Sequence, residues 1–223
     1  MRSQRLQRFV PAGLALLCVV PVTAGGVRLA SLASGVVTPE NARFFDSPVP
    51  VVVHVVGASL FLLLGIGQLH PGLRRRSPAW HRRAGRGIVA AGLAAALSGL
   101  WMSVFYALPA HDNDLLLAFR LLAGTGMAAS LVLAVVAVRR RDIAAHRAWM
   151  LRGYALGLGA GTQVVTTLPW VLVAGQPGPT VRALLLGLGW VVNLAVAEAV
   201  VRAPRRRVVR QPRAAMAANT GAQ

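Results

Sequence analysis

The stretch RRRSPAWHR at residues 74–82 decides how this chain folds, because it recurs as RRRDIAAHR at residues 139–147, 65 positions later. Each copy begins with three arginines, continues with four other residues and ends in His-Arg. An apolar stretch long enough to cross a bilayer lies on both sides of each copy. The duplicated unit is therefore predicted to be a membrane hairpin, two helices joined by a short basic turn.

The composition places most of the chain in lipid. Hydrophobic residues make up 56% of the sequence, charged residues 13%, and the mean hydropathy is +0.60. About twenty apolar residues in a helix rising ~1.5 Å per residue cross a hydrocarbon core of roughly 30 Å. The sequence therefore predicts an all-α fold, a polytopic integral membrane helix bundle with about six transmembrane helices. The expected spans are Phe9–Val27, Val51–Leu69, Ile88–Leu108, Leu115–Val138, Tyr154–Ala174 and Val181–Val201.

The repeat predicts how the central spans are arranged. A shift of 65 residues places His81 on His146 and brings the apolar runs on both sides into register. Two equivalent hairpins, residues 51–108 and 115–174, would then be related by a pseudo two-fold axis along the membrane normal. The first and last spans flank this duplicated core within a transmembrane domain of residues 9–201. A chance match in an arginine-rich chain is the alternative explanation.

The arginines orient the spans. All 24 basic residues are arginine, and most lie in segments that would share one side of the membrane with the N-terminus. Arginines in short loops stay on the cytoplasmic side, so both termini are predicted to be cytoplasmic. These termini are residues 1–8 and a basic, disordered tail at residues 202–223. The other side holds only four arginines and four of the six acids: Arg28, Arg43, Arg120, Arg182, Glu40, Asp46, Asp112 and Asp114.

The formal net charge of +18 raises the question of nucleic acid binding. A nucleic-acid module gathers its charge on one folded face and interleaves aromatic residues, whereas here the charge marks one side of the loops. No nucleic-acid partner is therefore expected. The expected partner is the bilayer, because an arginine close to anionic headgroups gains about 1 kcal/mol. The predicted lipid contacts are Arg74, Arg75, Arg76, Arg139, Arg140 and Arg141.

The first span has two interpretations. Three arginines precede its apolar run, and Val22-Thr23-Ala24 has the form of a signal-peptide cleavage site. We favour an uncleaved first helix. Cleavage would leave five spans and move the mature N-terminus outside. This span also contains Cys18, the single cysteine, which excludes an internal disulfide and forms no metal-thiolate pattern.

A candidate polar site lies on the outer side. An ionisable side chain in a membrane span is costly and usually faces the bundle interior. His54 lies about one turn inside the second span, and the 65-residue offset pairs Arg120 with Val55 beside it. Tyr106 and His111 lie near the same level, so these residues form the candidate site with His54 and Arg120. In the alternative, His54 is a core hydrogen-bonding residue and Arg120 anchors the topology by reaching an acid: Asp112, Asp114 or Asp46.

A second candidate site lies on the inner side, where the repeat brings His81 and His146 toward one axis. Two facing neutral imidazoles are what axial ligation of a b-type haem requires, and arginines such as Arg86 and Arg152 could pair with its propionates. Gln68 at the end of the second span completes this inner site. Alternatively the His-Arg pairs bind lipid phosphate or start helices, because His81 precedes its apolar run. The haem ligands considered are His54, His81 and His146.

The chain resembles the bacterial predicted membrane proteins grouped as domain of unknown function 2306. The resemblance is carried by His54 on a helix ending in LLLGIGQ at 62–68, by WHRRAGR at 80–86, and by HRAWMLR at 146–152. It implies a multi-span protein of the bacterial inner (plasma) membrane, and no established reaction, substrate or cofactor. Thr162-Gln163 departs from the more polar, often arginine-bearing, step of the family. The family's marked positions fall on His54, Gln68, His81, Arg86, His146, Trp149 and Arg152.

Three classes of function follow. The leading hypothesis is membrane electron transfer, with haem b or a quinone held by histidines. The alternative is a proton- or anion-coupled small-molecule transporter in which His54 and Arg120 bind the ion and helix kinks at Pro21 or Pro169 serve gating. The third is a non-catalytic membrane assembly or lipid-interaction protein. Enzymatic activity stays open, because the sequence has no Gly-rich phosphate loop, nucleophile elbow, zinc helix motif or paired catalytic carboxylates.

Overall fold

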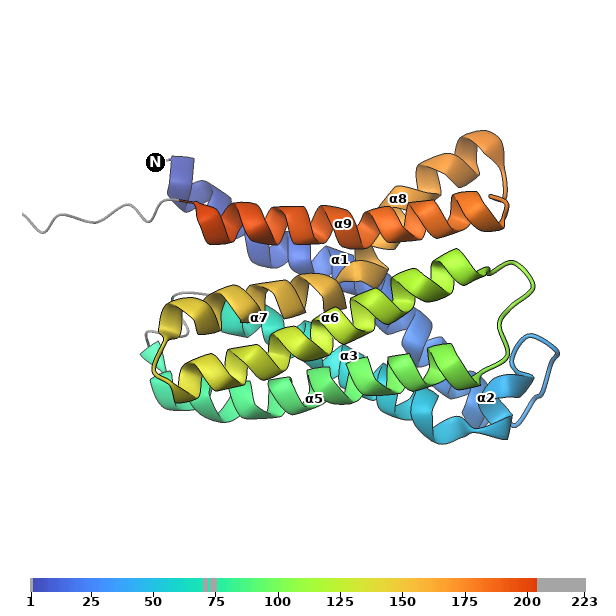
Figure 1. Ribbon diagram of the computed structural model, residues 1–223, viewed down its shortest axis with the longest axis horizontal. Coiled ribbons are helices and arrows are strands. Elements are labelled where there is room, and N and C mark those ends of the chain that lie inside the picture. Colours follow the sequence, from blue (N-terminus) through green and yellow to red (C-terminus); the bar gives the residue numbers. More distant parts are fainter. Residues whose placement is uncertain (1, 70–71, 73–75, 204–223) are drawn as a thin grey trace, which may run out of the picture.

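The computed structural model describes residues 2–69, 72 and 76–203, and every regular element in these residues is an α-helix. Most of the helices are long and run roughly antiparallel along one axis (Figure 1). The elements are α1 (Arg2–Ala33), α2 (Ala42–Asp46), α3 (Pro48–Leu69), α5 (Pro78–Phe105), α6 (Asp114–Arg139), α7 (Ile143–Gly157), α8 (Gly159–Ala174) and α9 (Pro179–Arg202).

The bundle has two chemically different ends. We name them the Asp112 end, which carries α2 and the connections 106–113 and 175–178, and the Arg139 end, which carries the connection 140–142 (Figure 1). The arginines predicted to bind lipid that the structure describes are all exposed at the Arg139 end: Arg76, Arg139, Arg140 and Arg141. Arg74, Arg75 and the tail beyond Ala203 lie outside the described residues.

The number of spans agrees with the sequence prediction. Five helices in the described part of the chain are long and apolar enough to cross a membrane, and α7 with α8 make a sixth span if this bent pair is counted as one. The all-α, six-span fold class is therefore confirmed. The chain is a multi-pass membrane protein. Its spans are helical, because no water in the bilayer core could bond to an open backbone. Many large apolar side chains of these helices are exposed and face lipid.

Two helices begin earlier than their apolar runs predicted. α5 begins at Pro78 rather than near Ile88, since proline is well accommodated in the first turn of a helix. α7 begins at Ile143 because the Asp142 side chain caps it, accepting a hydrogen bond of 2.9 Å from the Ala145 backbone N–H. His81, which precedes its apolar run, is therefore the fourth residue of α5.

The span expected over Tyr154–Ala174 is bent. The chain breaks at Leu158, between α7 and α8, and the two helices differ in direction by 46°. The repeat supplies the reason: Leu93-Ala94-Ala95-Ala96 in the unbroken α5 corresponds to Leu158-Gly159-Ala160-Gly161. Each glycine favours a helix by about 1 kcal/mol less than alanine does. α1 and α8 themselves continue through Pro21 and Pro169.

The helices pack as two hairpins with two flanking spans. α3 packs against α5 and α6 against α7, and α5 joins the hairpins through α6. α1 lies against α3 and α8, while α9 lies against α6, α7 and α8. This is the duplicated core that the repeat predicted, with the first and last spans on its outside (Figure 1).

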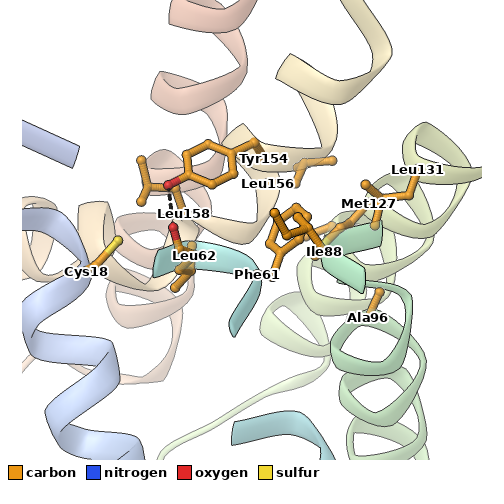
Figure 2. Packing of buried hydrophobic residues seen from close by; sticks show 11 residues of the cluster. Cys18, Phe61, Leu62, Ile88, Ala96, Met127, Leu131, Tyr154, Leu156 and Leu158 are labelled. Carbon is orange, nitrogen blue, oxygen red and sulfur yellow. Dashed lines mark hydrogen bonds between the residues drawn. The ribbon is translucent and has the colours of Figure 1, made fainter. Parts of the chain in front are cut away.

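The buried side chains at the centre of the core are closely packed (Figure 2). The Phe61 ring fits against Gly92 of α5 and Gly157 of α7, which are 65 residues apart: a Cβ built at either would lie 2.6 Å or 2.8 Å from the ring. The Tyr154 hydroxyl donates a hydrogen bond of 2.8 Å to the Leu62 carbonyl. Equivalent glycines of both hairpins thus receive one aromatic side chain, which lets the helix backbones approach closely.

Candidate functional site

A cavity of about 470 Å³ opens at the Asp112 end of the bundle. Residues of α3, α5 and α6 form one wall, and residues of α8 and α9 form the other. Its deeper lining is mostly apolar, with Met127, Leu156 and Trp190, whereas charged side chains gather where the helices end. A concave site with apolar walls and a few convergent polar groups is the usual form of a small-molecule site.

A buried carboxylate organises the charged part of this lining. Asp112 bridges two helices: its Oδ2 accepts a bond of 2.7 Å from Arg120 Nη2 on α6, and its Oδ1 accepts one of 3.1 Å from Arg182 Nε on α9. The Asp112 side chain is only 1% exposed. Burial raises the pKa of this carboxyl, but the two guanidinium groups more than offset burial, and its pKa lies below its ordinary value.

A third guanidinium lines the same cavity. Arg43 on α2 donates a hydrogen bond of 3.1 Å to the Ala107 carbonyl, and its Cζ lies 4.7 Å from the centre of the Phe44 ring. Arg28 lies over the same ring at 4.4 Å but does not line the cavity. Burial and the positive charge of Arg28 lower the pKa of Arg43. The cavity lining therefore contains three guanidinium groups and one carboxylate.

The local sequence holds this end of the molecule together. The Asn113 side chain caps α6 by accepting a bond of 3.1 Å from the Leu116 N–H, which places Asp112 directly before the helix. The Tyr106 hydroxyl donates a bond of 2.5 Å to the Ser47 carbonyl, and its ring meets Phe44 edge-on. The loop after α5 and the short α2 are thus tied to each other beside the cavity.

His54 lines the deeper part of the cavity. Its Nδ1 lies 2.8 Å from the Ala95 carbonyl oxygen of α5, and because a carbonyl only accepts, Nδ1 is the donor. Gly99 leaves room for the ring, since a Cβ at Gly99 would lie 3.1 Å from His54 Cε1. A neutral His54 therefore keeps Nε2 as an acceptor. His54 bonds to the core, as one interpretation of the sequence had it, and it also lines the cavity, where the candidate outer site was expected.

The predicted outer site is brought together in part. His54, Tyr106 and Arg120 line the cavity, whereas His111 is exposed and is not among its lining residues. The alternative for Arg120, an anchor to Asp112, is also present, because the same guanidinium makes that ion pair. Sequence reasoning did not place Arg43, Arg182 or Gln163 in the site. The available signal was that Arg43, Arg120 and Arg182 are among the few arginines on the acid-rich side.

The step Thr162-Gln163, where the sequence departs from the family pattern, connects α8 to α9. The Thr162 hydroxyl donates a bond of 2.8 Å to Asn193 Oδ1, and Gln163 Nε2 donates one of 3.1 Å to the Leu186 carbonyl. Asn193 in turn donates 3.0 Å to the Ala155 carbonyl of α7. These bonds position Gln163 in the cavity wall and join the two halves of the broken span to α9.

The residues of the predicted inner site lie near the Arg139 end without sharing a described cavity. His146 Nδ1 is 2.9 Å from the Ala134 carbonyl of α6, and His81 occupies the equivalent place in α5. Arg152 makes a two-pronged ion pair with Glu198 of α9, at 2.5 Å and 3.2 Å. Gln68 has its Nε2 buried between α3 and α5, while Arg86 is exposed.

The three histidines considered for haem cannot share one iron. His54 is fifteen residues from Leu69, so at ~1.5 Å per residue it lies roughly 22 Å along α3 from the Arg139 end. An axial histidine nitrogen must lie within about 2 Å of the metal, so His54 cannot share an iron with His81 or His146. Among the described residues no group of three or more His, Cys, Asp or Glu could hold a metal ion.

The fold and the cavity together define a multi-pass α-helical membrane protein with an arginine-lined cavity at one end. A family model described as Predicted membrane protein (DUF2306) matches residues 51–201, most of the chain, and the protein belongs to this family. The match includes both hairpins and α9, and it confirms the resemblance read from the His-Arg stretches. No curated protein matches the chain, and no solved structure matches it.

Proposed function

We propose that this protein binds a small molecule carrying an oxyanion in the cavity at the Asp112 end. The observation that carries the proposal is the excess of guanidinium over carboxylate groups around that cavity. Arg43, Arg120 and Arg182 converge there, and the single carboxylate, Asp112, already bonds to two of them. Guanidinium groups bind phosphate and carboxylate oxygens in a two-pronged geometry, and they do so more strongly away from water.

This proposal develops the anion-coupled transport hypothesis, in which binding is the first step. Arg43 is the best residue for testing the proposal, because its guanidinium bonds to a backbone carbonyl and makes no ion pair with Asp112. Arg43→Gln should therefore remove charge from the cavity without leaving a buried carboxylate unpaired. Arg28→Gln is the matched control, since Arg28 stacks on the same Phe44 ring outside the cavity.

The experiment is a thermal-shift titration of the full chain in a neutral detergent, with hexyl phosphate as the probe and hexanol as its uncharged counterpart. A ligand at 100 times its Kd stabilises by about 2.7 kcal/mol, which corresponds to a rise in Tm of about 5 °C or more. Wild type and Arg28→Gln should show this rise with hexyl phosphate. Arg43→Gln should need at least about tenfold more probe. Equal shifts in all three proteins, or equal shifts with hexanol, would refute anion binding.

Electron transfer is a second candidate, favoured by the way His146 is held. A histidine whose Nδ1 donates to a backbone carbonyl has the orientation typical of metal-bound histidines, and His81 is its counterpart in the other hairpin. A haem bound there would supply one-electron chemistry, and His81 and His146 would hold it. Its test is a reduced-minus-oxidised absorption spectrum of protein purified from cells given haem precursor. A b-type signal should disappear in His81→Ala and His146→Ala and persist in His54→Ala.

A further inference from the structure

A second hollow continues from the cavity along the outside of the bundle. It is a shallow groove of about 340 Å³ whose lining is almost entirely apolar. The groove and the cavity share three lining residues, Ala160, Gln163 and Leu186, so the two are continuous. The rest of the groove is lined by Val164, Thr167, Leu168 and Val171 of α8.

The position of α8 explains why this groove exists. α8 leaves the Leu158 break and packs against α9 and α1, while α3, α5 and α6 form the opposite wall of the cavity. Figure 1 shows α8 beside the first half of α9 at the Asp112 end. Its groove residues recur at three- and four-residue spacing, so they form one stripe on the helix. This stripe is in the membrane half that contains the cavity, because the break lies midway along the bent span.

A polar atom in the groove, the Thr167 hydroxyl oxygen, is buried and has no partner among the residues that the structure describes. Its neighbour Thr166 instead donates a bond of 2.8 Å to the Leu185 carbonyl of α9. A buried hydroxyl without a partner costs free energy, and an acceptor supplied by a ligand would remove that cost.

We propose that the ligand of the cavity is an anionic phospholipid of the surrounding bilayer, which enters sideways along α8. Its phosphate would bind Arg43, Arg120 and Arg182, an acyl-ester carbonyl would accept from Thr167, and an acyl chain would lie in the groove. This inference rests on the proposed function, because it names the source of the oxyanion. A phospholipid carries a charged head, ester carbonyls and an apolar chain, and the three arginines, the Thr167 hydroxyl and the apolar groove offer a complement to each.

A matched pair of neighbouring residues on α8 tests the lipid. Val164 lines the groove, whereas Val165 is 59% exposed and lies outside it. Val164→Trp should fill the groove, while Val165→Trp adds the same side chain to a lipid-facing surface. Thr167→Val removes only the unpartnered hydroxyl. The measurement is native mass spectrometry of the full chain in neutral detergent with added dioleoyl-phosphatidylglycerol, dioleoyl-phosphatidylcholine or hexyl phosphate.

Wild type and Val165→Trp should bind dioleoyl-phosphatidylglycerol at least tenfold more tightly than dioleoyl-phosphatidylcholine. Val164→Trp and Arg43→Gln should each weaken the anionic lipid at least tenfold, and Thr167→Val about threefold. Hexyl phosphate, too short to fill the groove, should respond to Arg43→Gln and not to Val164→Trp. If Val164→Trp leaves lipid affinity unchanged while Arg43→Gln still weakens the binding of hexyl phosphate, this inference is overturned and anion binding remains. Indifference of both probes to Arg43→Gln would overturn both proposals.

Discussion

The two hairpins of this protein come from the same repeat but end differently. In the first, α5 runs without interruption from Pro78 to Phe105 beside α3. In the second, the returning helix stops at Gly157 and restarts as α8 in a new direction. Both hairpins contribute residues to the cavity lining, and the cavity lies where α8 turns away from the direction of α7. The comparison teaches that a break in one half of a duplicated core can open a cavity that residues of both halves line.

Glycines account for this difference twice over. Gly159 and Gly161 weaken the helix where α5 has Ala94 and Ala96, and both then serve as contact points for other helices. A Cβ at Gly159 would collide with the Trp190 ring of α9, and one at Gly161 with a backbone carbonyl of α1. The same residues therefore permit the break and let the flanking spans pack closely against it.

The largest loss of stability is expected at Asp112, whose ion pairs join α6 to α9. Asp112→Asn would leave Arg120 and Arg182 without their carboxylate, and breaking a buried ion pair in this way costs about 3 kcal/mol of unfolding free energy. Tm measured in detergent should fall accordingly. Asp114→Asn, an exposed residue in the first turn of α6, is the control and should change Tm little. Equal effects of the two variants would contradict the bridging role of Asp112.

The same ion pairs predict a pH dependence. The folded protein lowers the pKa of Asp112, so its contribution to stability is fully present above the ordinary carboxyl pKa of about 3.9. The contribution is lost as the pH falls through the lower pKa of the folded state. The Tm difference between wild type and Asp112→Asn should therefore be constant near neutrality and shrink below about pH 4. A Tm difference that grows on acidification would show that folding raises the pKa of Asp112 instead of lowering it.

A somewhat smaller effect is expected at the break itself. Gly161→Ala restores the residue that α5 has at the equivalent position, but its Cβ would meet the Leu17 carbonyl of α1. Overpacking against a backbone atom costs about 2 kcal/mol, so Tm should fall. Gly87→Ala on α5 is the control, because no described atom lies within 4 Å of a Cβ there. A stabilised Gly161→Ala would mean that helix propensity outweighs the contact with α1.

The smallest effect is expected in the solid interface between the hairpins. Tyr154→Phe keeps the ring against Phe61 and Gly65 and removes the hydroxyl, which donates to the Leu62 carbonyl and also bonds to the Cys18 thiol. The expected loss is about 1 kcal/mol. Denaturant titration should show this loss, with hexyl phosphate binding unchanged because Tyr154 does not line the cavity. Weakened binding would mean that the core and the cavity are coupled.

Local sequence properties predicted some of the site residues and could not predict others. His54, Tyr106 and Arg120 stood out because polar groups are rare in or beside apolar runs, and they do line the cavity. Arg182 was not assigned, because its ion pair joins residues 70 positions apart and requires α9 to lie beside the loop before α6. His111 was included for its level in the sequence, yet it is exposed. Depth along a helix could be predicted, whereas the facing of a loop side chain could not.

The sequence by itself determined the helices, their number as spans, the hairpin repeat and the concentration of arginine at one end. It could do so because a bilayer requires long apolar helices, and charge and periodicity along the chain report them directly. The tertiary structure decided that the second hairpin breaks at Leu158 and that Arg43, Arg120 and Arg182 meet around one carboxylate. These features depend on how Gly159 and Gly161 fit against α9 and α1, and such contacts exist only between packed helices.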